Sequence, residues 1–328
     1  MEFIRENILL NKLIIVDGIG KCGKSIMLDL ISSFRSVEKK DFNPFLEYIG
    51  LAYKYNKISI DMATAILKTE MDSELYNNMI GRYINTRLSD DTSLYKYHSP
   101  AKYIERSLAQ DGPVVSKKVL AENPIYLCWS HDLINKSDII FHAFESRLEW
   151  IYLNRRPIDI IYEWNKKNYS QRMSKDPTEM QYSIKYQNTC VPEVALGWEQ
   201  EFLDISPDER TVKMIHTYFK WNREALFKKQ DYSNLHVINF EDLVTQPLRE
   251  IEKLKQIIGN KPLPCIDKIL LSANCPRIIN EHEYEERETN IKKNISKKYA
   301  DLISEIKLMY EDIKQLATFS IEKNAINN

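Results

Sequence analysis

The apolar residues of this 328-residue chain form short runs, most of which are continuous rather than alternating. The clearest runs lie at Leu13–Val16, Pro113–Val115, Asp138–Phe141, Trp150–Leu153 and His236–Asn239. Continuous runs of this length are typical of parallel strands that helices cover on both faces. We therefore predict that these five runs are strands of a mostly parallel sheet.

Segments with helical spacing, in which apolar residues recur every three or four positions, separate these runs. They lie at Lys24–Ser33, Asp61–Tyr83, Pro157–Asn168, Asp208–Lys229 and Leu248–Ile258. Alternation of strands and helices is typical of a doubly wound sheet, so the chain is predicted to adopt a three-layer α/β/α fold.

Two regions look like additions to that sheet. Residues 44–110 predict a helical insertion, and residues 280–328 predict a charged helical tail. Apolar residues of the tail step by three or four, which predicts a helix that docks on the rest of the protein. They are Ile291, Ile295, Tyr299, Leu302, Ile306 and Met309. Because eight Gly and twelve Pro leave little room for flexible linkers, we expect a single domain over residues 1–328.

The composition narrows the class of protein. A hydrophobic content of 43% and a charged content of 28% are typical of a folded, soluble protein. A net charge of −1 offers no basic field, so we expect no nucleic-acid partner. The six His form no metal-binding pattern, and no apolar run reaches the ~18 residues of a membrane span. Five Cys without a CxxC pair, and the lack of a secretory signal, predict a reduced, cytoplasmic protein.

The segment "IIVDGIGKCGKSIM" carries the strongest local motif. Gly18, Gly23, Lys24 and Ser25 match G-x-x-x-x-G-K-[ST], with a predicted strand before the loop and a predicted helix after it. Glycines let the backbone wrap an anion closely, the start of the helix adds its positive end, and Lys24 and Lys21 supply charge. We therefore predict a phosphate-binding loop in a P-loop NTPase-like fold.

A phosphate loop alone leaves three classes of function open. A nucleotide kinase would transfer a phosphoryl group from ATP, with Mg²⁺ held by Ser25 and a strand-borne acid. A sulfotransferase would hold an activated nucleotide in the same loop without a metal. A non-catalytic protein would only bind the nucleotide.

Two later segments bear on this choice. In "IYLNRRPIDIIYEW" a predicted strand is followed by Arg155 and Arg156, and Pro157 opens a helix. Arginines at this edge of a parallel sheet suit phosphate oxygens. In "LHVINFEDLVTQPLREIEKLKQIIG" a strand is followed by an acidic turn, a proline, an amphipathic helix and a glycine stop.

Taken in order, these three segments resemble the nucleotide-dependent sulfotransferases, including bacterial members with a helical insertion. "KCGKS" resembles the 5′-phosphosulfate loop of that family, "LNRRPIDIIYEW" its 3′-phosphate segment, and "FEDLVTQP" its "YEDL…P" segment. The resemblance covers about residues 12–260 and implies 3′-phosphoadenosine 5′-phosphosulfate as the donor, without a metal. It implies sulfuryl transfer to a hydroxyl or amine, and it names no acceptor; a glycan or a small metabolite would fit.

The resemblance also implies roles for individual residues. Lys21 matches the catalytic lysine on the bridging oxygen of the donor, and Arg155 matches the arginine on its 3′-phosphate. The predicted donor-binding residues of the loop are Gly18, Gly20, Lys21, Cys22, Gly23, Lys24 and Ser25. The chain departs from the family at Glu163, where a serine is common beside the 3′-phosphate, and at Lys24, where threonine is usual.

The residue that accepts the acceptor's proton has three candidates. His131 in "LCWSHDL" is favoured because the family places its catalytic histidine similarly and because the ordinary pKa of histidine is near neutral. Glu38 and Glu47 are the alternatives, since other branches of the family use a glutamate from the second strand region.

The polar stretch "GRYINTRLSDDTS" is predicted to line the acceptor site. Its polar residues are Arg82, Asn85, Arg87, Asp90 and Asp91.

The kinase alternative stays open because "IIVDGIGKCGKSIM" resembles nucleotide kinases about as well as it resembles sulfotransferases. It is weaker because Asp17 is the one clear strand-end aspartate for Mg²⁺, and it lies before the loop.

Overall fold

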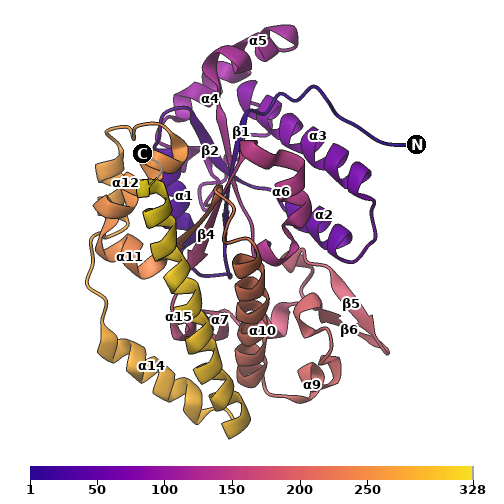
Figure 1. The fold of residues 1–328 in the computed structure, drawn as a ribbon, viewed down its shortest axis with the longest axis vertical. Coiled ribbons are helices and arrows are strands. Elements are labelled where there is room, and N and C mark those ends of the chain that lie inside the picture. Colours follow the sequence, from indigo (N-terminus) through magenta and orange to yellow (C-terminus); the bar gives the residue numbers. More distant parts are fainter. Residues whose placement is uncertain (327–328) are drawn as a thin grey trace.

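The computed structural model describes residues 1–326, with side chains through residue 317 (Figure 1). A five-stranded sheet forms its centre, with the strand order β2-β3-β1-β4-β7 and all neighbours parallel. The strands are β1 (Lys12–Asp17), β2 (Val37–Phe42), β3 (Ile125–Trp129), β4 (Leu148–Asn154) and β7 (Leu235–Asn239). The prediction of a doubly wound, mostly parallel sheet is confirmed.

Alternate residues of the central strand point to opposite faces of the sheet. Leu13 and Ile15 of β1 belong to one buried apolar cluster, and Ile14 and Val16 belong to the other. Both sets are fully buried, which explains why the run reads as continuously apolar. The sheet is therefore the middle layer of three.

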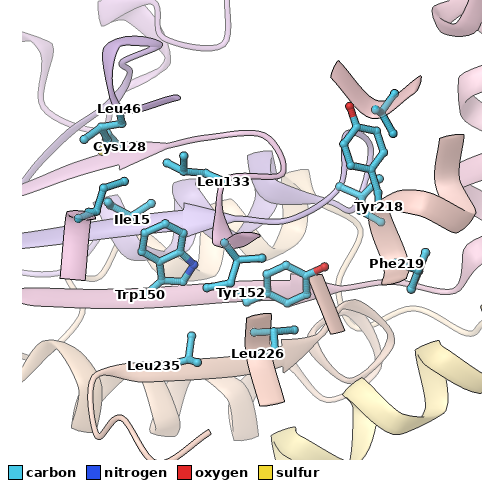
Figure 2. Packing of buried hydrophobic residues seen from close by; sticks show 14 of the residues in the cluster. Ile15, Leu46, Cys128, Leu133, Trp150, Tyr152, Tyr218, Phe219, Leu226 and Leu235 are labelled. Carbon is cyan, nitrogen blue, oxygen red and sulfur yellow. The ribbon is translucent and has the colours of Figure 1, made fainter. Parts of the chain in front are cut away.

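Helices cover each face. One face carries α1 (Lys24–Ser32), α11 (Phe240–Thr245), α12 (Pro247–Ile258) and α13 (Ile266–Ser272). The other carries α2 (Phe45–Lys54), α3 (Ile60–Met79), α6 (Asp138–Phe144), α7 (Pro157–Lys166), α10 (Pro207–Lys228) and α15 (Lys297–Ile326). Figure 2 shows Trp150 and Tyr152 of β4 on this second face, near Leu226 of α10. Asn222 of α10 donates to the Tyr152 hydroxyl at 3.2 Å, which ties that helix to the sheet.

The predicted helix boundaries follow the signals in the sequence. Pro157, Pro207 and Pro247 stand at the first turns of α7, α10 and α12, where a missing N–H costs nothing. Ser206 forms a capping box before α10, and Gly259 ends α12 in a left-handed conformation with φ 78°. Each of the five predicted helices is present within a few residues.

Two of the predicted strands are wrong. Pro113–Val115 begins the helix α5 (Pro113–Glu122), and Asp138–Phe141 lies within α6. Both are short apolar runs, whose period cannot distinguish a strand from a buried helical turn. In α6 nearly every residue is buried, so no polar face shows in the sequence.

Two strands of the central sheet were missed. In β2 the residues Glu38, Lys39 and Lys40 are buried although they are charged, so the strand lacks an apolar run. β3 is apolar, but it follows a proline directly and is only five residues long. A two-stranded antiparallel hairpin, β5 (Ser183–Tyr186) and β6 (Thr189–Pro192), was not predicted either.

The insertion is helical, as predicted. It contains α2, α3 and α4 (Pro100–Ser107), with an irregular stretch between α3 and α4. Further short helices are α8 (Tyr169–Arg172) and α9 (Glu199–Asp204), with 3₁₀ turns at Leu94–Lys96, Ile134–Lys136, Glu145–Arg147, Pro177–Glu179 and Glu193–Ala195. Within the described residues, no helix is long and apolar enough to cross a membrane.

The C-terminal tail consists of α14 (Glu281–Lys293) and α15. The six apolar residues predicted to dock are all buried in, or packed against, the apolar cluster that α10 joins. Figure 1 shows α15 running alongside α10. The tail therefore completes one helical layer of the fold.

Residues 327–328 of the predicted tail lie outside the described residues. The single domain over residues 1–328 stays a prediction.

Candidate functional site

A cavity of about 520 Å³ opens at the carboxyl ends of the central strands. This is the edge at which parallel α/β sheets bind ligands. Its basic lining residues are Lys21, Lys24, Lys40, His131 and Arg155, and its acidic ones are Glu47, Asp91, Asp132 and Glu179. Phe42, Trp129, Trp164 and Tyr169 add aromatic walls. The cavity thus brings together the predicted phosphate loop and two of the three predicted base candidates.

The loop between β1 and α1 needs glycine at two positions. Gly18 has φ 142°, and a β-carbon there would lie 2.6 Å from the Leu153 carbonyl oxygen. Gly23 has φ 102°, and a β-carbon there would lie 2.2 Å from the Phe240 ring. Neither the backbone angle nor the space admits another residue, so both glycines of the motif hold the loop in its shape.

The two lysines of the loop differ in their surroundings. Lys24 is buried, and its Nζ donates to the Gly18 carbonyl oxygen at 2.6 Å. Lys21 has φ 73°, a left-handed value that is uncommon for a side chain other than glycine. Its Nζ lies 5.9 Å from the centroid of the Tyr169 ring, at the wall of the cavity. Lys21 is therefore the loop cation that faces the open space.

Of the predicted loop residues Gly20 and Cys22, Gly20 lines the first cavity and Cys22 does not. The Cys22 side chain is buried in the apolar cluster beneath α1, and burial raises the pKa of its thiol. Trp164 of α7 donates from Nε1 to the Gly20 carbonyl oxygen at 2.8 Å. The indole thus supports the loop from the side of α7.

Arg155 follows β4 and lies against the same loop. Its NH1 donates to the Lys21 carbonyl oxygen at 2.6 Å, and its guanidinium lies 4.6 Å from the centroid of the Phe240 ring. Its Nε is buried and has no hydrogen-bond partner within the described part of the chain. Arg156 points elsewhere, since it pairs with Glu281 at 2.8 Å. Of the two consecutive arginines, Arg155 is the one that reaches the cavity.

A second cavity, of about 200 Å³, shares Arg155 with the first. Arg277, from the loop after α13, lines it too and lies 5.4 Å from the centroid of the Phe240 ring. Two guanidinium groups thus flank one aromatic ring. Sequence reasoning missed Arg277, because this residue stands alone in a loop outside every recognised motif.

Glu163 lines neither cavity, so it is not the acid that faces Arg155. The acids of the second cavity are Asp159, Glu241 and Glu283. Asp159 is engaged by Arg287 at 2.7 Å, and Glu241 accepts from the Arg156 amide at 3.0 Å. Arg287 also pairs with Glu283, and Arg156 Nε lies 3.9 Å from Glu241, so each of the three acids has an arginine partner.

His131 and Glu47 form a pair at the wall of the first cavity. The Glu47 carboxylate accepts from the His131 backbone amide at 2.8 Å, and His131 Nδ1 lies 3.5 Å from the same oxygen. The side chain of His131 is 39% exposed, and its ring meets Phe42 edge-on at 5.5 Å. A carboxylate beside one ring nitrogen can stabilise the charged imidazolium and fix the tautomer.

Glu38 lies outside this cavity and is committed to a buried ion pair. Its carboxylate accepts from Arg106 NH1 at 2.6 Å and pairs with Lys102 Nζ at 3.0 Å. Burial would raise its pKa, but the bonds from Arg106 and the charge of Lys102 lower the pKa to about 2. The structure therefore gives Glu38 the role of holding the insertion to β2 rather than that of a base.

The two aspartates near the loop, Asp17 and Asp132, differ in their surroundings, and the sequence analysis considered only Asp17. Asp17 is fully buried, and its carboxylate accepts from the Ser130 hydroxyl at 3.0 Å and the Ile134 amide at 2.7 Å. Asp132, three residues after β3, lines the cavity, and burial raises its pKa to about 6. Sequence reasoning missed Asp132 because β3 was not recognised.

Within residues 1–326, no group of three or more His, Cys, Asp or Glu could hold a metal ion.

Of the polar stretch expected at the acceptor site, Asp91 lines the first cavity. Its carboxylate accepts from the Ser25 hydroxyl at 3.1 Å. Arg82, Asn85, Arg87 and Asp90 do not line this cavity. The insertion thus touches the phosphate loop through one acidic residue.

Several solved structures, among them sulfotransferase domains, align with this chain at low sequence identity. The sulfotransferase domain of the Synechococcus PCC 7002 olefin synthase is 12% identical, with 97% of this chain and 98% of that chain covered and a TM-score of 0.43. The sulfotransferase domain from the curacin biosynthetic pathway is 15% identical, with 79% and 77% covered and a TM-score of 0.39. Retinol dehydratase in complex with androsterone and the inactive cofactor PAP is 12% identical, with 95% and 81% covered and a TM-score of 0.30.

No protein-family model and no curated protein sequence matches this chain.

Proposed function

We propose that the protein is a sulfotransferase that moves a sulfuryl group from 3′-phosphoadenosine 5′-phosphosulfate to a hydroxyl or amine. One observation carries the proposal: two cavities meet at Arg155, one at the phosphate loop and one beside Arg277. A ligand with anionic groups at both its 5′ and 3′ positions requires two such basic sites. A nucleotide without a 3′-phosphate would leave Arg277 without an anion to bind.

The loop would hold the 5′-phosphosulfate. Its backbone N–H groups, the start of α1 and Lys24 would bind the phosphate oxygens. In the reaction the acceptor oxygen or nitrogen bonds to sulfur while the bond from sulfur to the bridging oxygen breaks. The 5′-phosphate leaves with an additional negative charge, and Lys21 would stabilise that charge. No step requires a metal.

The acceptor's proton would pass to the His131–Glu47 pair. Both residues line the first cavity, whereas Glu38 does not. His131 would take the proton, and Glu47 would stabilise the imidazolium that forms. The acceptor, such as a glycan or a small metabolite, would enter on the side of Phe42 and Trp129.

All five cysteines are free thiols, which supports our placing the protein in the reducing cytoplasm.

A specific observation also favours the second candidate, a kinase that uses ATP and Mg²⁺. Asp132 follows β3, the neighbour of β1, and lines the cavity together with Ser25. An acid at that strand end and a loop serine are the usual protein ligands of Mg²⁺ in such kinases. The third candidate, a nucleotide-binding protein without catalysis, would need only the loop.

Ligand-induced stabilisation separates the three candidates. We expect adenosine 3′,5′-bisphosphate without Mg²⁺ to raise the melting temperature more than ATP with Mg²⁺ does. Incubation with radiolabelled sulfate donor and an extract of host cells should then transfer label to an acceptor. Stabilisation by ATP with Mg²⁺ alone would reject the sulfotransferase in favour of the kinase. Stabilisation without any labelled product would favour the non-catalytic binder.

A further inference from the structure

Asp91 reaches the phosphate loop from the insertion. Its Oδ2 accepts from the Ser25 hydroxyl at 3.1 Å, and its Oδ1 pairs with Lys96 Nζ at 3.2 Å. The residues around it form an irregular segment held by local bonds, such as that from the Leu94 amide to the Asn85 carbonyl oxygen at 2.8 Å. One contact from this segment therefore links the insertion to the loop.

The contact lies where a bound phosphate needs a partner. Ser25 is the second residue of α1, a nine-residue helix that has no side-chain cap and no acid in its own first turn. Such a helix start attracts an anion. Asp91 supplies a carboxylate there from a distant part of the sequence.

The same loop satisfies its lysine internally. Lys24 Nζ donates to the carbonyl oxygens of Gly18 and Ile19, at 2.6 and 3.3 Å. Both polar side chains that a phosphate would bind, Lys24 and Ser25, thus already have protein partners. A bound phosphate must take over both of them.

Asp91 carries its charge at neutral pH. Burial raises the pKa of the Asp91 carboxyl, but bonds from Lys96 and Ser25 and the charge of Lys40 together hold it below its usual range. A phosphate that binds Ser25 therefore meets a carboxylate of the same sign at close range. Like charges at that separation repel strongly enough to change affinity severalfold.

We infer that Asp91 competes with the ligand's phosphate for Ser25, so that binding of the nucleotide expels Asp91 and releases the segment of residues 85–93. The inference rests on the proposed function only in requiring that an anion binds at the loop. Because Asp91 itself lines the first cavity, its release couples occupancy of the donor site to the space that an acceptor would fill. Asp91 would thereby set the order in which the two substrates bind.

The substitution Asp91→Asn tests the inference, because asparagine still accepts a hydrogen bond from Ser25 but has no charge. We expect adenosine 3′,5′-bisphosphate, titrated without metal at low salt, to bind D91N about tenfold more tightly than wild type. Asp90→Asn is the matched control. It removes the same charge one residue away, where the carboxylate faces Asn85 and Arg87 rather than Ser25, and it should change affinity less than about twofold.

Hydrogen exchange gives a second measurement. In wild type, amides of residues 85–94 should exchange faster when the bisphosphate is bound, and in D91N they should exchange fast without it. Equal or weaker binding by D91N, or slower exchange in the bound wild type, would overturn the inference while leaving the proposed function intact. Weaker binding of Mg²⁺-ATP by D91N, with bisphosphate binding unchanged, would show instead that Asp91 is a metal ligand. If the bisphosphate binds neither protein, the inference and the proposed function both fail.

Discussion

Arg277 offers the sharpest test of the proposal that the second cavity binds an anion. Its guanidinium lies 5.4 Å from the centroid of the Phe240 ring, and Arg155 lies 4.6 Å from the same centroid. The substitution Arg277→Ala should leave the phosphate loop unchanged, because Arg277 does not line the first cavity. A hydrogen bond from a charged donor contributes about 1.5–3 kcal/mol, so the 3′-phosphate should bind roughly 10- to 150-fold more weakly. Since Arg277 is partly exposed, we expect the lower part of that range.

The assay compares two ligands in two proteins. Adenosine 3′,5′-bisphosphate and adenosine 5′-monophosphate are titrated into wild type and R277A, and the difference isolates the 3′-phosphate. The monophosphate should lose less than about twofold. Arg249→Ala, on the exposed side of α12, controls for the change in net charge. Equal losses for the two ligands, or no loss for either, would refute the assignment of the second cavity to a 3′-phosphate.

Three further predictions follow from the site and its surroundings. Lys21→Ala should abolish transfer while reducing nucleotide affinity only modestly, since its charge acts on the leaving oxygen; turnover close to wild type in a sulfate-transfer assay would contradict this role. His131→Ala should lower kcat by roughly 10²–10⁴ with donor affinity kept, and unchanged kcat would move the base to Glu47 alone. The lowered pKa of Glu38 contributes stability that is present above its unfolded pKa of 4.5 and is lost as the pH falls toward about 2. This contribution is about 3 kcal/mol, so Glu38→Gln should flatten the pH dependence of urea unfolding between pH 5 and about 2, and an unaltered slope would disprove the linkage.

The sequence predicted those parts of the molecule whose signals are local. The phosphate loop lies within eight consecutive residues, and Gly18 and Gly23 are required there by their own backbone angles. The strands β1, β4 and β7 are apolar because both their faces are covered. Arg155 could be found because it directly follows such a strand and precedes a proline.

The parts that were missed depend on distant partners. Glu38 of β2 is buried because the insertion supplies Arg106, 68 residues away, as its partner. The other buried charges of β2 pair elsewhere, Lys39 with Asp41 and Lys40 with Asp29. The His131–Glu47 pair joins residues 84 positions apart. The sequence could therefore suggest each residue as a base candidate, but it could not predict that the two are in contact. Asp132 and Arg277 lie in loops without a recurrent pattern, and only the assembled sheet brings them to the cavities.

The contacts of α15 bear on when, during synthesis of the chain, the residues around Arg155 become ordered. Asn154, next to Arg155, donates to the Tyr310 carbonyl oxygen at 3.3 Å, and the Tyr310 hydroxyl donates to Glu241 at 3.0 Å. The phosphate loop is synthesised long before α15, whose Tyr310 contacts Asn154 and Glu241. A nascent chain on the ribosome would therefore carry the loop well before α15 emerges, and it would complete the proposed nucleotide site only once α15 has docked.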